Sequence, residues 1–177
     1  MEICKSVKVV RAELYFLPVD LRVPLKFGDQ ILSSVKCARV RVEIESSDGM
    51  RAEGWGETPL SAAWVWPSSI EYHIREKRLI EVCKLIAASY IESDLEGHPF
   101  DIGSQFIGNH LGDVISSHNK CHEDEEALPY LGALVAFSAF DLAVYDAYAK
   151  MNDCRVFEVF NENFLNFDLS KAFDDER

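Results

Sequence analysis

The sequence predicts an α+β fold in which a three-stranded antiparallel meander is followed by a helical bundle. Two observations lead to this expectation. Three segments in the first third of the chain alternate apolar and polar residues with the period of a half-buried strand. The remainder has helical spacings, and they are clearest in a long segment in which alanines recur every three or four residues.

The expected strands are Val7 to Phe16, Val35 to Ser46 and Arg51 to Glu57. The second alternates more cleanly, with Val40, Val42 and Ile44 on one face and charged residues on the other. A Ser-Asp-Gly turn joins it to the third, because glycine accepts the positive φ of a hairpin turn. Two prolines between the first and second strands predict an extended, irregular connection there.

The expected helices run from about Ile70 to Ser89, from Pro99 to Phe106 and from Leu128 to Met151. The polar segment from Gly108 to Glu126 is expected to be a loop with at most one helical turn. The last helix is apolar nearly all round and should therefore be the most buried. We expect one domain over residues 1–152, and a poorly ordered segment over residues 153–177 that starts a linker to whatever follows.

Composition bounds the function. The net charge of −12 argues against nucleic acid and against an anionic membrane surface, because both need clustered Lys and Arg. The five cysteines are odd in number and widely spaced, which favours reduced thiols over a disulfide framework. No signal peptide is evident at the N-terminus, and the longest apolar run is short for a membrane span. A cytoplasmic protein is the resulting expectation.

Two segments resemble a known family. The helix from Ala139 to Lys150, which reads AFDLAVYDAYAK, resembles the end of the N-terminal domain in the mandelate racemase and muconate lactonizing enzyme type of the enolase superfamily. Gly54-Trp55-Gly56-Glu57 is similar to that family's Gly-x-Gly-Glu segment. The resemblance spans about residues 7–160 and departs from the family at Arg155 to Asn161, where a proline and a Leu-Leu-Gly-Gly-like segment are missing.

The resemblance implies a capping domain cut off before its catalytic barrel. In such enzymes a Lys or His removes the proton α to a carboxylate, and Mg²⁺ stabilises the resulting enediolate. A (β/α)8 barrel needs at least about 200 residues, far more than follow Met151. No catalytic residue and no metal ligand is therefore assigned in this chain, Mg²⁺ is implied only for a full-length relative, and the chain alone is expected to be inactive.

The same resemblance implies substrate-contacting loops at about Val19 to Ser33 and Thr58 to Trp66. Their candidate binding residues for a carboxylic or sugar acid are Arg22, Lys26, Phe27, Trp64 and Trp66. For the tryptophans the alternative is packing against the barrel, and for the two cations it is a solvated surface position. For Glu57 a structural role is expected.

Two other functions stay open. The chain could be a standalone binding or interaction module that uses the exposed cap surface, and its apolar tail then favours self-association. It could also be a small zinc protein built on the segment from His118 to Glu126, which holds His, Cys and acidic residues but lacks a second ligand pair. Asp141 and Asp146, five residues apart, point to different faces of their helix and are expected to be structural.

Overall fold

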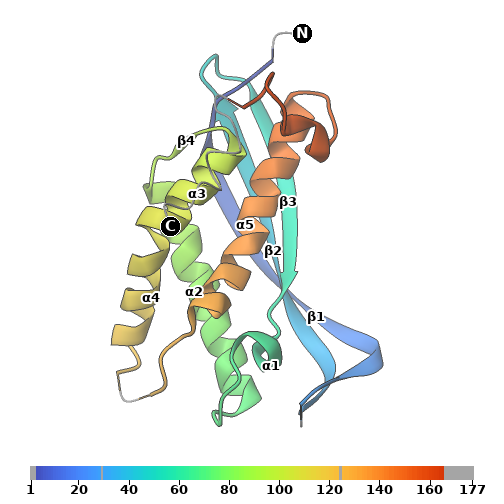
Figure 1. Cartoon of the computed structure of the whole chain (residues 1–177), viewed down its shortest axis with the longest axis vertical. Helices are drawn as coiled ribbons and strands as arrows, with labels where there is room; N and C mark the ends of the chain where they lie inside the picture. The colour runs from blue at the N-terminus through green and yellow to red at the C-terminus, as the bar shows by residue number, and fades with distance from the viewer. Residues whose placement is uncertain (1–2, 29, 124, 166–177) are drawn as a thin grey trace, which may run out of the picture.

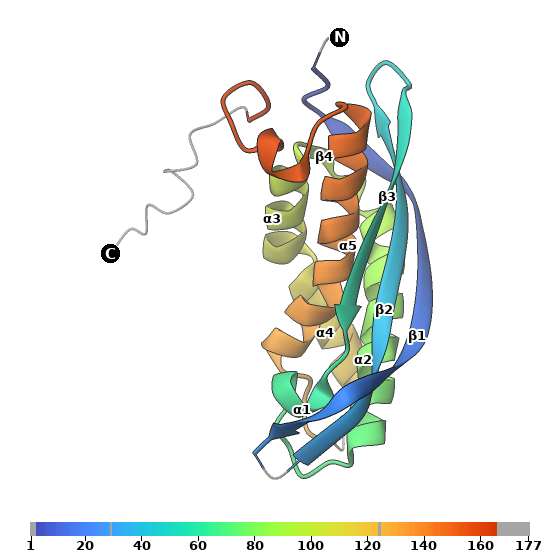
Figure 2. The ribbon, with the colours of Figure 1, turned by 90° about the vertical axis from the view of Figure 1, so that its right-hand side faces the viewer.

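A curved antiparallel sheet lies along one side of a group of helices (Figures 1 and 2). The computed structural model describes residues 3–28, 30–123 and 125–165. The strand order is β3-β2-β1-β4, and every pairing is antiparallel. The predicted meander is confirmed and gains a short fourth strand. The strands are β1 (Val7–Phe27), β2 (Gln30–Ser46), β3 (Arg51–Pro59) and β4 (Glu96–Gly97).

The helices follow the strands in sequence and confirm the α+β fold class. The long alanine-rich helix is present and is the longest of the described helices, with eleven buried residues. They are α1 (Ala62–Val65), α2 (Tyr72–Glu92), α3 (Pro99–Asn109), α4 (Leu111–Lys120), α5 (Tyr130–Met151) and the 3-10 turn η1 (Val156–Val159).

The expectation of a loop at residues 108–126 was wrong, because α4 occupies its centre. Leu111, Val114 and His118 are buried on one side of this helix, at the spacing of three, four and seven residues that one face requires. The polar residues between them are on the solvent side. His118 therefore lies on the buried face of α4, although the sequence pattern predicted a polar loop residue.

The prediction of an irregular connection between the first two strands was also wrong, because both strands continue through it. The first two strands pair almost continuously, from Val7 opposite Ser46 to Phe27 opposite Gln30. The register of the pairing is irregular between Val9 and Arg11 and between Asp20 and Leu25, and the second stretch includes Pro24. Beyond Lys8, β2 is the only strand paired with β1 among the described residues, and proline is tolerated on such an edge because no second strand needs its N–H.

Helix α5 packs directly on β3. The backbone carbonyls of Ala139 and Ala143 lie so close to Gly56 and Gly54 that a Cβ atom on either glycine would overlap them. By length and composition α5 could cross a membrane, the one such helix among the described residues. Its small-residue face against the sheet gives that apolar composition a packing explanation.

The described part of the C-terminal segment lies back against the domain. Val159, Phe164 and Leu165 are buried, and the Phe164 ring meets Tyr148 of α5 edge-on at a centroid distance of 6.2 Å. The buried His98 imidazole Nε2 lies 3.1 Å from the Val159 carbonyl oxygen. Residues 166–177, also expected to be poorly ordered, lie outside the described part of the chain.

Candidate functional site

The far half of the β1–β2 hairpin bends under the helices and meets the segment that follows β3 (Figure 2). Between them lies a pocket of about 400 Å³. Its lining is apolar except for Ser61, whose Oγ is buried and has no hydrogen-bond partner within the described residues. The lining residues are Leu21, Leu25, Leu32, Val35, Pro59, Ser61 and Trp64.

This end of the molecule also exposes large apolar side chains. Trp64 is 55% exposed and Leu25 47%, although both contribute to the pocket wall. Val23 and Ile31, on the two strands of the hairpin, are 68% and 73% exposed. Contiguous exposed apolar surface of this kind marks a place where a ligand or another protein surface binds.

A second pocket, of about 390 Å³, shares Leu32 with the first. It is more polar, since Ser33, Ser34 and Tyr72 contribute to its lining. Burial is the main cause that raises the pKa of Tyr72 to about 12, with the nearby Glu76 as the next cause. The Tyr72 phenol therefore stays protonated at neutral pH. A ligand with an apolar end and a polar end would find matching surfaces in these two neighbouring pockets.

Trp66 holds the pocket-forming segment to the core. Its side chain is fully buried, and its indole N–H donates to a carboxylate oxygen of Glu126 at 3.1 Å. The other oxygen of that carboxylate accepts from the Ser68 hydroxyl at 2.6 Å. The hydrogen bond from Ser68 is the main cause that lowers the pKa of Glu126, and the one from Trp66 is the next cause. The buried Arg75 guanidinium donates to the carbonyls of Ala62 and Trp66 at the two ends of α1.

The structure distributes the predicted substrate-contacting residues unevenly. Trp64 lines the apolar pocket, whereas Trp66 lies in the core and offers no surface in this chain. Arg22 and Lys26 are exposed on β1, and each directly follows a pocket-lining leucine in the sequence, but neither lines the pocket. The Phe27 side chain lies outside the described part of the structure.

Several pocket residues were missed in the sequence. Leu21, Leu25 and Leu32 come from the stretch interpreted as an irregular connection, and Tyr72 begins α2. The sequence signal that could have found the leucines is the spacing of the apolar residues on the two sides of the hairpin turn. Glu57, expected to be structural, pairs with Arg39 at 2.6 Å on the exposed face of the sheet.

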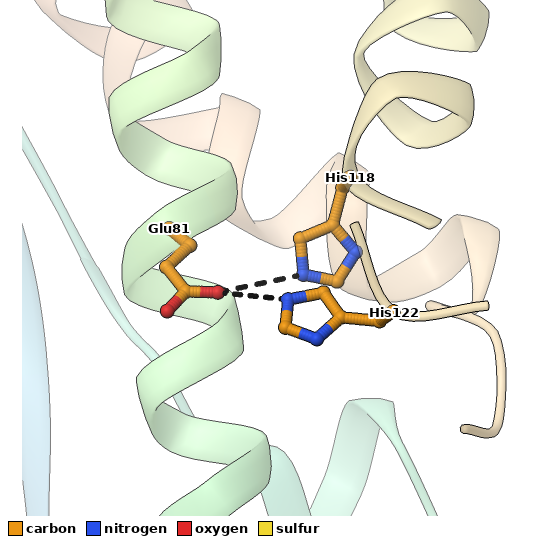
Figure 3. A group of neighbouring side chains, drawn as sticks. All are labelled: Glu81, His118 and His122. Carbon is orange, nitrogen blue, oxygen red and sulfur yellow. Dashed lines mark hydrogen bonds and ion pairs between the residues drawn. The ribbon is translucent and has the colours of Figure 1, made fainter. Parts of the chain in front are cut away.

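The histidine-rich segment forms a different group from the one expected. His118 and His122 lie beside Glu81 of α2 (Figure 3). Cys121, which lies between the two histidines in sequence, is exposed and is not part of the group. Two imidazoles and one carboxylate are a poor match for Mg²⁺, which prefers oxygen ligands in octahedral geometry. Among the described residues, no group of three or more His, Cys, Asp or Glu suits that ion better.

Comparison with known proteins identifies the fold. No protein-family model and no curated protein sequence matches the chain. A solved structure of an enolase-superfamily member from Listeria innocua matches with a TM-score of 0.54 and 20% identity, covering 88% of this chain and 34% of its own. An enolase from Pseudomonas fluorescens, solved with bound magnesium, potassium and tartrate, matches with a TM-score of 0.52 and 18% identity, covering 88% and 32%. The chain therefore spans about a third of the length of these solved structures.

Proposed function

We propose that this chain, which has the fold of an enolase-superfamily N-terminal domain, acts as the substrate-capping domain of a Mg²⁺-dependent enzyme of the mandelate racemase and muconate lactonizing enzyme type. The reaction class would be abstraction of the proton α to a carboxylate, as in a racemase, dehydratase or cycloisomerase. The substrate would be a carboxylic or sugar acid, and the enzyme would be cytoplasmic. The catalytic groups and Mg²⁺ would come with a (β/α)8 barrel.

The observation behind the proposal is the apolar pocket between the hairpin and Trp64. Both segments with which the family resemblance associates substrate contact meet at that pocket, although they are far apart in sequence. An apolar wall that closes over a barrel mouth excludes water, which strengthens every electrostatic interaction beneath it. Arg22 and Lys26 are exposed on the same hairpin, where their positive charge would attract an anionic substrate.

The role of this chain's residues is binding and exclusion of water. Leu25 and Trp64 would touch the end of the substrate remote from the reacting carbon. Binding energy gained remote from the reaction orients the substrate and is a major source of specificity. Changes in this pocket should therefore alter substrate choice.

The test uses the protein at the length its gene encodes, alongside the 177-residue chain alone. Both are incubated with Mg²⁺ in D2O with a panel of α-hydroxy acids, sugar acids and dipeptides, and α-proton exchange is followed by NMR. We expect exchange only in the presence of a barrel. The Trp64→Ala variant should change the ratio of kcat/KM between apolar and polar substrates, because a methylene-scale contact is worth about 10–200-fold in discrimination.

The matched control is Ile74→Ala, which removes an exposed apolar side chain from α2 outside the lining of both pockets. It should leave substrate preference unchanged. A gene-length protein without α-proton exchange on any acid, or exchange by the 177-residue chain alone, would refute the capping role.

A standalone interaction module is the second candidate. The exposed side chains of Val23, Leu25, Ile31 and Trp64 favour it, since they would suit a protein partner as well as a barrel. Under this function the pocket variants would change self-association or partner binding in size-exclusion chromatography and would have no catalytic effect.

A further inference from the structure

Three side chains that can bind a metal converge between α2 and the end of α4. His122 Nε2 lies 3.1 Å from Glu81 Oε2, and His118 Nε2 lies 4.0 Å from the same oxygen (Figure 3). All three candidate ligand atoms lie within 4.8 Å of one another. Glu81 is far from the histidines in sequence, so the packing of α2 against α4 creates the group.

The backbone explains why the two imidazoles face the same way. His118 lies in the last turn of α4, and the chain keeps a helical turn beyond it, with the His122 N–H donating to the Asn119 carbonyl at 3.0 Å. Residues four apart on a helical turn lie on the same face. The ring centroids of His118 and His122 are accordingly 4.7 Å apart.

The hydrogen bonds of His118 leave one nitrogen available. Its Nδ1 lies 3.3 Å from Asn119 Oδ1, and this amide oxygen also accepts from the Leu128 N–H at 2.9 Å. The amide oxygen can only accept, so Nδ1 is the protonated nitrogen and Nε2 carries the lone pair. This Nε2 is buried, has no hydrogen-bond partner among the described residues, and is directed toward Glu81 (Figure 3).

We propose that Glu81, His118 and His122 form a binding site for a divalent transition-metal ion of the zinc type. Two imidazoles and one carboxylate are a known ligand set for zinc, and they leave the fourth tetrahedral position to water. A second hydrogen bond that fixes the tautomer, as from His118 to Asn119, is the usual outer support of a metal-bound histidine. The unpartnered, buried Nε2 of His118 would then be one of the ligands of the ion.

The distances are close to those that zinc requires. Tetrahedral ligands at 2.0–2.1 Å from zinc lie about 3.3 Å apart. The His122–Glu81 separation already fits. The His118–Glu81 separation of 4.0 Å must shorten by about 0.7 Å on binding, and the two imidazole nitrogens, which lie within 4.8 Å of each other, by at most about 1.5 Å. His122 is partly exposed, so its ring can make this movement and offer the ion a route from solvent.

The surrounding charges permit a cation. Arg78 is the nearby positive group, and its guanidinium forms an ion pair with Glu125 and donates to the Glu126 carbonyl at 3.2 Å. A bound ion would fasten α2 to the turn after α4.

The experiment titrates Zn²⁺ into the tag-free, EDTA-treated 177-residue chain, with Co²⁺ as a spectroscopic probe. We expect one Zn²⁺ per chain with micromolar or tighter affinity, a Zn²⁺-dependent rise in melting temperature, and the visible absorption bands of tetrahedral Co²⁺. Glu81→Gln and His122→Gln should each weaken Zn²⁺ binding by at least tenfold, because even the outer partners of metal ligands are worth about 10–100-fold.

Two variants control for other binding. His73→Gln removes a histidine from an exposed His–Glu pair on the same helix, where His73 Nδ1 lies 3.1 Å from Glu71, and should leave Zn²⁺ affinity unchanged. Cys121→Ser tests thiol ligation and should also leave it unchanged. If the wild-type chain binds Zn²⁺ no more tightly than His122→Gln, or if only Cys121→Ser loses binding, the group is an ordinary His–Glu hydrogen bond and the proposal is refuted.

Discussion

Replacing Gly56 with alanine should strongly destabilise the domain, because α5 leaves no room for a side chain there. An ideal Cβ on Gly56 would lie 2.0 Å from the Ala139 carbonyl oxygen and 2.7 Å from the Ala143 nitrogen. Real Cβ contacts essentially never fall below 3.0 Å. The contacted atoms belong to the backbone of a central helix and cannot move by changing a rotamer, so α5 itself would have to shift by about an ångström.

The size of the effect follows from this overlap. Adding a methyl group to a well-packed core typically costs about 1–3 kcal/mol. The contact with helix backbone places Gly56→Ala at the upper end, about 3 kcal/mol in the free energy of unfolding. A domain is stable by only about 5–15 kcal/mol in total. With a slope of about 2 kcal/mol per molar urea, the unfolding midpoint should fall by roughly 1.5 M.

The assay is urea unfolding followed by far-UV circular dichroism, with Gly108→Ala as the matched control. Gly108 lies in α3, and a Cβ there would meet nothing within 4 Å. Alanine should therefore stabilise α3 by about 0.5–1 kcal/mol, since glycine is unfavourable inside a helix. A loss below about 1 kcal/mol for Gly56→Ala would show that the close approach of α5 to β3 does not determine stability.

Three further substitutions have defined outcomes. Burial raises the pKa of Asp141 to about 6, so the folded state binds a proton more tightly than the unfolded state does. The free energy of unfolding should therefore increase as pH falls from 7 toward 4. Asp141→Asn should abolish this increase and should raise the free energy of unfolding at pH 8 by up to about 3 kcal/mol, measured by urea unfolding. Asp146→Ala removes the carboxylate that accepts the Trp55 backbone N–H at 2.8 Å, and calorimetry should record a loss of about 1–2 kcal/mol. Leu25→Ser combined with Trp64→Ser should reduce hydrophobic-dye fluorescence without lowering the melting temperature, and an unchanged dye signal would contradict the exposed apolar surface.

The fold was predictable because periodicity is a local property. Alternation located the first half of β1, the second half of β2 and most of β3, and the alanine spacing located α5. The sequence did not reveal that Gly54 and Gly56 face those alanines, although both features are visible in it. The small residues on β3 and on α5 serve the same contact, which only the packing makes apparent.

The errors come from residues whose role depends on neighbours distant in sequence. Prolines suggested an irregular segment at 17–34, yet an edge strand has no second partner that needs their N–H. His118 counted as a loop residue because its burial depends on α2. The missing member of the histidine group, Glu81, lies on another helix, so no spacing rule within residues 118–126 could have found it.

The contrast between Trp64 and Trp66 explains how the short segment after β3 can be both anchored and exposed. Trp66 is held by Glu126, which lies between α4 and α5, and the carbonyls of Ala62 and Trp66 are held by Arg75 of α2. Trp64 lies in the same short helix with its ring directed to the pocket and solvent. A four-residue helix has little stability of its own, so tertiary contacts must fix its conformation. The position of the pocket wall is therefore set by the core before any ligand binds, and the entropy cost of ordering Trp64 is reduced accordingly.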